Sequence, residues 1–128
     1  MAAPALQSSA PIVPVRDIDA SLAFYEGRLG FRRLYVASDK SSAEVSRDGA
    51  QIMLVACDDA DTLAVTATNM SVYVRVRDMA GLWADLGPRL SDLPSARLRP
   101  PFDQSYGMRE FHVKDPDGFL LFFGEPVQ

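Results

Sequence analysis

The chain has 128 residues, of which 48% are hydrophobic and 23% charged, and its formal net charge is −4. This length fits a single domain that can bury a core without disulfides or metal. The acidic balance argues against nucleic acid as a partner, and neither a lysine-rich amphipathic segment nor a run of transmembrane length suggests a membrane.

The N-terminal residues 1–9 are expected to form a flexible tail ahead of a single domain, 10–128. Met1–Ala10 lacks the basic start and apolar core of a secretory signal. The single cysteine, Cys57, cannot form an internal disulfide, which fits a reducing compartment. We therefore expect a cytoplasmic location.

The first half of the domain, 10–57, predicts a β-α-β-β-β order. A short strand at Ile12–Val15 contains Pro14, which suggests an edge or a bulge. Asp17 or Asp19 can cap the following helix, and Gly30 supplies its stop. Asp48-Gly49 between apolar runs indicates a hairpin. The three later strands are expected at Phe31–Ser38, Ala43–Arg47 and Gln51–Cys57.

The segment 58–69 is expected to be a solvated acidic linker. Asp58, Asp59 and Asp61 lack the alternating ligand positions and closing glutamate of a calcium loop. The sequence therefore predicts a loop without a cation site.

The second half, 70–125, predicts the same order. A strand at Met70–Val76 leads into a helix capped by Asp78, whose regular part we expect Pro88 to end early. An insertion with a short strand near Arg97–Arg99 falls between Ser91 and Tyr106. The last strands, Gly107–Lys114 and Phe119–Gly124, are joined by the tight turn 115–118.

The two halves repeat one another. Val15-Arg16-Asp17-Ile18 recurs 61 residues later as Val76-Arg77-Asp78-Met79, and Asp48-Gly49 recurs 69 residues later as Asp117-Gly118. Because both ends of each copy agree, chance similarity is the weaker explanation. Two copies are too few for a solenoid, so they are expected to share one sheet or cup.

These residues resemble a known family. The segment Pro14–Tyr25 followed by Leu29-Gly30-Phe31, together with Gly107–Phe111 and Asp115-Pro116-Asp117-Gly118, is similar to the vicinal oxygen chelate superfamily, which includes glyoxalase I, extradiol dioxygenases, fosfomycin resistance enzymes and bleomycin resistance proteins. The resemblance covers residues 10–125. It implies an α+β fold of two βαβββ modules, 10–57 and 70–125, curled into a cup. It also implies a homodimer that completes the clefts, although the sequence leaves open whether modules pair within one chain or across two.

The resemblance also implies where a divalent metal would be held in each module. Those positions carry Ala10 and Met53 in the first module and Ser71 and Phe122 in the second. These side chains are not usual metal ligands, and a shift by one residue does not supply any. We therefore expect no metal or other cofactor.

A catalytic set is also difficult to find. His112 stands where extradiol dioxygenases place a catalytic tyrosine, but a strand histidine bonded to a neighbouring backbone group or carboxylate is the simpler interpretation. Glu125 lies beyond the ligand position, and with Arg109 and Glu110 it is expected to form a surface or cleft-rim ion pair. Arg109 could alternatively orient an anionic ligand.

The sequence feature that favours a ligand site is a set of aromatic and apolar side chains. Strand alternation predicts that Met53, Leu120 and Phe122 share the floor of the cup. The candidate walls and lid are aromatic side chains, with plain core packing as the alternative: Tyr35, Tyr73, Phe102 and Tyr106. Phe102 and Tyr106 are expected on the inserted loop, where ligand contacts concentrate.

The leading hypothesis is a metal-free protein that resembles bleomycin resistance proteins and sequesters a small, partly aromatic molecule. The acidic groups Asp103, Glu110 and Glu125 could favour a cationic ligand. One alternative is a lyase or dioxygenase-like enzyme with a non-standard site, using His112 or Glu125 as base. A second is a small-molecule carrier or accessory subunit that joins a larger partner.

Overall fold

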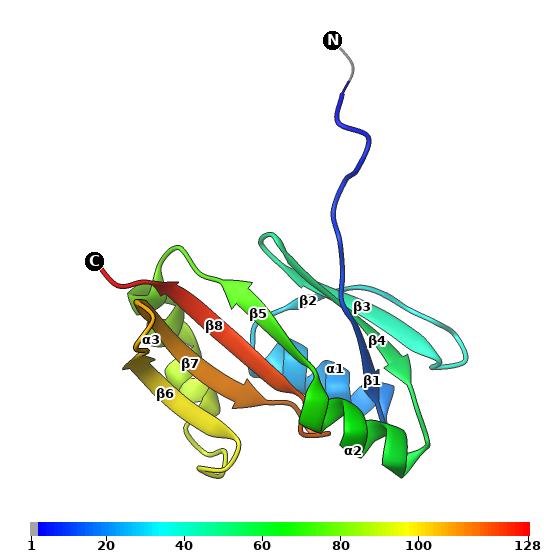
Figure 1. The fold of residues 1–128 in the computed structure, drawn as a ribbon. Coiled ribbons are helices and arrows are strands. Elements are labelled where there is room, and N and C mark those ends of the chain that lie inside the picture. Colours follow the sequence, from blue (N-terminus) through cyan, green and yellow to red (C-terminus); the bar gives the residue numbers. More distant parts are fainter. Residues whose placement is uncertain (1–2) are drawn as a thin grey trace.

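The computed structural model describes residues 3–128, and it contains two modules of the same design (Figure 1). The first consists of β1 (Ile12–Val15), α1 (Ile18–Gly27), β2 (Arg32–Val36), β3 (Ser42–Arg47) and β4 (Ala50–Ala56). The second consists of β5 (Ser71–Arg75), α3 (Met79–Leu90), β6 (Leu98–Asp103), β7 (Met108–Lys114) and β8 (Leu120–Pro126). The predicted α+β fold of two βαβββ modules is confirmed.

Each module forms its own four-stranded mixed sheet. The strand orders are β1-β4-β3-β2 and β5-β8-β7-β6, so the first strand of each module pairs in parallel with its last. The two sheets are not closed into one cup within the chain. Met53 therefore lies on one sheet, whereas Leu120 and Phe122 lie on the other.

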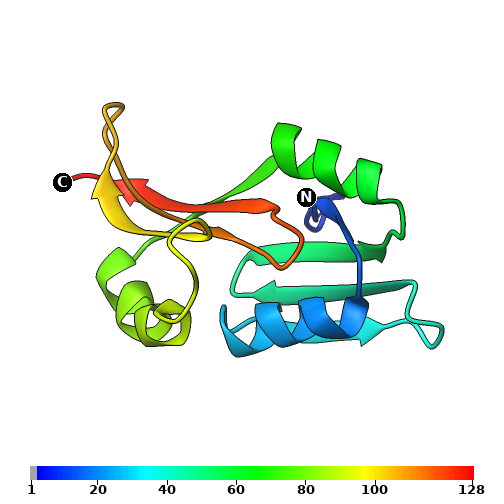
Figure 2. The same cartoon turned by 90° about the horizontal axis from the view of Figure 1, so that it is seen from below.

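Helices α1 and α3 cover the same side of their respective sheets (Figure 2). The core beneath them is continuous across both modules and includes Tyr25 and Leu54 from the first, with Leu86 and Phe111 from the second. Asp17 caps α1 and Asp78 caps α3, because each side chain accepts a hydrogen bond from the backbone N–H three residues later. The opposite face of each sheet is left open.

The turn Asp115-Pro116-Asp117-Gly118 ties the modules together. Asp115 is 1% exposed, and its carboxylate accepts hydrogen bonds from the backbone N–H groups of Asp117 and Phe119, both at 2.9 Å. The Tyr25 hydroxyl of α1 donates to the same carboxylate over 3.1 Å. The turn that contributes to the resemblance therefore has a structural role here.

The prediction of a loop at 58–69 is wrong, because this segment contains the helix α2 (Ala60–Asn69). Asp59 is its N-cap, and its side chain accepts hydrogen bonds from the backbone of Asp61 and the hydroxyl of Thr62. Leu63 is buried, so the helix has a weak apolar face that the aspartates obscure in the sequence. These acidic residues begin a helix rather than line a loop.

Two further boundaries differ from prediction. Pro88 lies inside α3, which continues to Leu90. Pro88 is exposed, so water can satisfy the Ala84 carbonyl that loses its backbone donor. The extra residues of the second module do not all lie in one insertion, because the β7–β8 turn (115–119) is longer than the β3–β4 turn (48–49). Phe102 consequently lies on β6 and not on an inserted loop.

The N-terminal segment lies apart from the two modules. Residues 3–9 are exposed and leave the body of the molecule (Figure 1), while residues 1 and 2 of the predicted tail lie outside the described part. Among the helices of residues 3–128, none has the length and apolar character needed to cross a membrane.

Candidate functional site

Four rings cross the open face of the second sheet, one from each strand. Tyr73 (β5) stacks on Phe122 (β8) with ring centroids 5.8 Å apart, and Phe122 lies 4.2 Å from the His112 ring (β7). His112 in turn lies 5.0 Å from Phe102 (β6), edge to face. We call Tyr73, Phe122, His112 and Phe102 the aromatic row. It is partly accessible, since Tyr73 is 40% exposed.

A carboxylate lies at the base of the aromatic row. Glu110 on β7 is 0% exposed and accepts hydrogen bonds from the hydroxyls of Tyr73 (2.8 Å) and Tyr106 (2.7 Å). Its other oxygen accepts a bond from the Gln104 amide (3.1 Å) and lies 2.8 Å from Nε2 of His112. The group therefore has a polar partner for each of its lone-pair directions, as a buried carboxylate requires.

These contacts govern the ionisation of the cluster. Burial alone would raise the pKa of Glu110, but the bonds from His112, Tyr106, Gln104 and Tyr73 outweigh it and lower the pKa to about 2. Burial and the bond to this carboxylate raise the pKa of Tyr73 to about 12. At neutral pH the cluster is an ionised carboxylate surrounded by donors.

Gly124 on β8 makes the arrangement possible. It pairs with Glu110 across the β7–β8 ladder, and a methyl group there would overlap the Tyr73 hydroxyl. The absence of a side chain at this position lets the Tyr73 ring cross β8 and reach the carboxylate.

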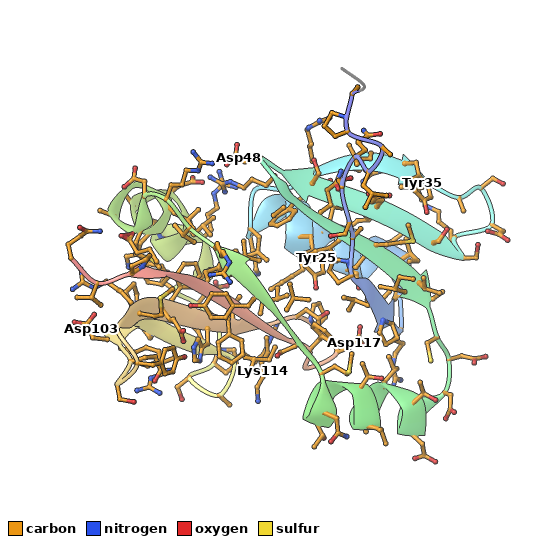
Figure 3. All side chains as sticks on the ribbon, turned by 45° about the horizontal axis from the view of Figure 1, so that its top comes forward. Tyr25, Tyr35, Asp48, Asp103, Lys114 and Asp117 are labelled. Carbon is orange, nitrogen blue, oxygen red and sulfur yellow. The ribbon has the colours of Figure 1, made fainter. Side chains whose placement is uncertain are left out.

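The structure brings together four of the predicted ligand-binding residues: Tyr73, Phe102, Tyr106 and Phe122. Two others, Tyr35 and Met53, flank Glu44 on the open face of the first sheet (Figure 3 labels Tyr35). In the same figure, Asp103 and Lys114 mark the second sheet. The predicted set is therefore divided between two sheets.

The expected ion pair of Arg109, Glu110 and Glu125 does not form. Arg109 pairs instead with Asp103, with Nε 2.8 Å from the carboxylate, and Glu125 accepts a hydrogen bond from the backbone N–H of Met79 at the start of α3. Strand alternation separates Arg109 from Glu110, because neighbouring residues on β7 point to opposite faces. The simpler interpretation of His112, a strand histidine bonded to a carboxylate, is confirmed.

Glu110 was missed as the centre of the site. The sequence places it beside Arg109, which suggests a surface pair. A usable signal was the even spacing of Glu110 and His112 on a strand whose intervening residues, Phe111 and Val113, are apolar. That spacing puts the carboxylate on the same face as the histidine.

The family positions for a metal do not fit one. They carry Ala10, Met53, Ser71 and Phe122, whose methyl, thioether, hydroxyl and phenyl groups are poor ligands for a divalent cation. Within residues 3–128 there is also no group of three or more His, Cys, Asp or Glu side chains placed to hold a metal.

A cavity of about 1110 Å³ lies beside the aromatic row, between the modules. Tyr73 and Arg75 of β5 line it, together with Asp48 and Ile52 of the first module. It shares Tyr73 with the aromatic row, but its lining also includes Val72, Val74 and Phe123, which belong to the core side of the second sheet.

Comparison with known proteins places this geometry in a family. Residues 8–123 match the family model described as the Glyoxalase/Bleomycin resistance protein/Dioxygenase superfamily. The chain belongs to this superfamily. Its members are expected to differ in ligand and chemistry, because one fold hosts many functions. Among curated proteins, none matches the chain.

Solved structures share this fold. A bleomycin-binding protein in complex with bleomycin is 25% identical, with 94% of this chain and 98% of that one covered at a TM-score of 0.75. A bleomycin resistance determinant encoded on transposon Tn5 is 24% identical, with coverage of 96% and 100% and a TM-score of 0.73. A fosfomycin resistance protein from Listeria monocytogenes is 16% identical, with coverage of 95% and 94% and a TM-score of 0.69.

Proposed function

We propose that the chain binds a small, partly aromatic molecule without a metal, in the manner of an antibiotic-sequestering protein. The observation that carries this proposal is the aromatic row, which offers ring faces along one side of a rigid sheet. Rings of a flat ligand can stack there, and the row is anchored below by Glu110. Sequestration breaks no bond in the ligand, so it needs no catalytic set.

The similarity to a protein solved with bleomycin supports this type of function. The ligand of this chain need not be bleomycin, because the shared feature is a class of fold. The location is expected to be cytoplasmic, as the single cysteine suggests.

The binding experiment uses an uncharged aromatic probe, 2-naphthylmethanol, titrated by ligand-observed NMR. We expect saturable binding that Phe122→Ala weakens about tenfold, because the central ring of the row is lost. Leu34→Ala is the control, since Leu34 is an accessible apolar residue, 40% exposed, that lies on β2 of the other module. Equal binding by the parent protein and Phe122→Ala would contradict the proposal.

A growth assay tests the antibiotic itself. Cells that express the chain are compared with cells that express Phe122→Ala under bleomycin. Protection lost in the variant would identify bleomycin as a ligand. A lack of both protection and binding would exclude bleomycin as the ligand, and other aromatic molecules would then be screened.

Association into a homodimer belongs to the same proposal. The sheets remain open within one chain, and apolar side chains such as Ile12 (64% exposed) and Met70 (59% exposed) lie at the surface. A second copy could cover them and complete the cleft. Native mass spectrometry should detect a dimer; a monomer throughout the micromolar range would contradict this part.

An enzyme that uses His112 as a base is the second candidate. It is favoured by the 2.8 Å contact with ionised Glu110, since a carboxylate partner orients a catalytic imidazole. Under this candidate, His112→Ala would abolish turnover of an identified substrate. Under sequestration, the ligand is recovered unchanged after incubation with the protein.

A further inference from the structure

The open face of the second sheet carries the opposite charge from the chain as a whole. The chain has a net charge of −4, yet Arg75, Arg99 and Lys114 all belong to this face. Arg99 lies opposite His112 in the β6–β7 ladder, and Arg75 lies opposite Gly124 in the β5–β8 ladder. Lys114 follows His112 by two positions on β7, so it shares the face.

The two guanidinium groups stand at the two ends of the aromatic row. Cζ of Arg99 lies 3.4 Å from the centroid of the Phe102 ring, and Cζ of Arg75 lies 6.0 Å from that of the Tyr73 ring. A guanidinium stacked on a ring keeps its N–H donors at the edge, where they can reach a ligand lying on the same rings.

Both guanidinium groups are available to a ligand. Neither Arg75 nor Arg99 forms an ion pair or a side-chain hydrogen bond with any residue of 3–128, and both are exposed. By contrast, Arg28, Arg33 and Arg109 are each bonded to a carboxylate. Within residues 3–128, Arg75 and Arg99 therefore differ from these three arginines in having no internal anion.

The carboxylates near the aromatic row already accept hydrogen bonds or ion pairs from this chain, so they are not free to bind a cationic ligand. Glu110 is buried and bonded to four side chains, and Asp103 is bonded to Arg109. Glu125 accepts the backbone N–H of Met79. Asp48 borders the neighbouring cavity with Arg75, but the two form no ion pair within the described residues.

We infer that the ligand of the aromatic row is a planar aromatic anion, a carboxylate or sulfonate, whose rings stack on the row while its charge pairs with Arg99 or Arg75. This inference rests on the proposed function and names the class of its ligand. Three interstrand spacings of about 4.8 Å separate β5 from β6, so the row is about 14 Å across. A molecule of two fused rings can therefore lie on one end of the row and reach one terminal guanidinium, while a larger ring system can cover more of it.

The test compares three probes that share one ring system: 2-naphthoate, 2-naphthylmethanol and 2-naphthylmethylammonium. Their dissociation constants are measured by ligand-observed NMR at pH 7 in low salt. We expect the anion to bind about three- to tenfold more tightly than the alcohol, and the cation more weakly than the alcohol. Added salt should reduce the preference for the anion.

Arginine variants test which side chains bind the anionic group of the ligand. Arg99→Gln and Arg75→Gln should each reduce the preference for 2-naphthoate, and the double variant should remove it, while all three keep the affinity for 2-naphthylmethanol within about twofold. Arg32→Gln is the matched control, because Arg32 is also an exposed arginine without an ion pair in the described chain, but it lies on β2 of the other sheet. Unchanged far-UV circular dichroism verifies that each variant is folded.

The outcomes separate the two proposals. Equal or tighter binding of the alcohol or the ammonium probe, with loss of binding in Phe122→Ala, would overturn the anionic class and retain the aromatic site. Preference for the anion that persists in the double arginine variant would also overturn this inference. If no probe binds and Phe122→Ala changes only the sedimentation of the chain, the face is a contact between copies and both proposals fail.

Discussion

A single buried carboxylate organises the candidate site. Glu110 orients two tyrosines, a glutamine and a histidine, and these fix one edge of the aromatic row. Because the pKa of Glu110 is lowered from 4.5 to about 2, its contribution to stability is fully present above about pH 4.5 and is lost as the pH falls toward 2. The carboxylate thus links acid stability to the integrity of the site.

The corresponding prediction concerns Glu110→Gln. Between pH 6 and pH 3, the parent protein should lose about 2 kcal/mol of unfolding free energy that the variant does not lose, because the carboxyl group is protonated in the unfolded chain and still ionised in the folded one at pH 3. Urea titrations at both pH values measure the difference. Glu44→Gln on the first sheet is the control and should follow the parent; an identical pH dependence in Glu110→Gln would contradict the assignment.

A second residue-scale prediction concerns Gly124→Ala. The added methyl group would displace the Tyr73 ring, so we expect a loss of about 1–3 kcal/mol of unfolding free energy and weaker probe binding. Gly27→Ala, at a position with open space, should change stability by less than about 1 kcal/mol. Equal effects of the two substitutions, measured by urea unfolding, would show that Gly124 does not shape the site.

The sequence predicts individual members of the site more readily than their connections. Tyr73, Phe102, Tyr106 and Phe122 are recognisable as strand or turn aromatics, and they do cluster. The role of Glu110 is hidden because a charged residue next to an arginine is usually a surface partner. Three of its four partners come from β5 and from the β6–β7 turn, and such contacts depend on register, which single positions do not specify.

At the scale of elements, the repeat predicts the order of strands because both copies carry the same cap and turn residues. The helix α2 was missed for a physical reason: one buried leucine, Leu63, gives it little hydrophobic periodicity. Its start is determined instead by the Asp59 cap. Acidic residues that look like a solvated loop can equally begin a helix, where they satisfy free backbone N–H groups.

This dependence on a cap predicts a local effect of Asp59→Ala. The substitution should cost about 1 kcal/mol of helix stability and lower the protection of α2 amides in hydrogen exchange about fivefold. Asp58→Ala removes a neighbouring exposed aspartate that makes no side-chain hydrogen bond with residues 3–128 and serves as the control. A uniform loss of protection in both modules would show that α2 does not unfold locally.

At the scale of the whole molecule, two similar modules could unfold separately, yet their contacts indicate that they do not. One continuous core includes residues from both, and the Tyr25 hydroxyl donates to buried Asp115 across the boundary. Arg28 of the first module also pairs with Asp92 of the second at 2.6 Å. The two sheets are therefore expected to hold their relative position, and with it the cavity beside the aromatic row.

The resulting prediction is one cooperative unfolding transition. The chain's single tryptophan, Trp83, lies in α3 and reports on the second module by fluorescence, whereas far-UV circular dichroism reports on both. The two urea curves should coincide, and Tyr25→Phe should shift both together by about 1 kcal/mol, because Asp115 loses one of its donors while keeping two backbone N–H bonds. Tyr35→Phe, at an exposed hydroxyl 3.5 Å from Ser42, should shift neither curve. Curves that separate in Tyr25→Phe would show that this contact alone joins two independently stable modules.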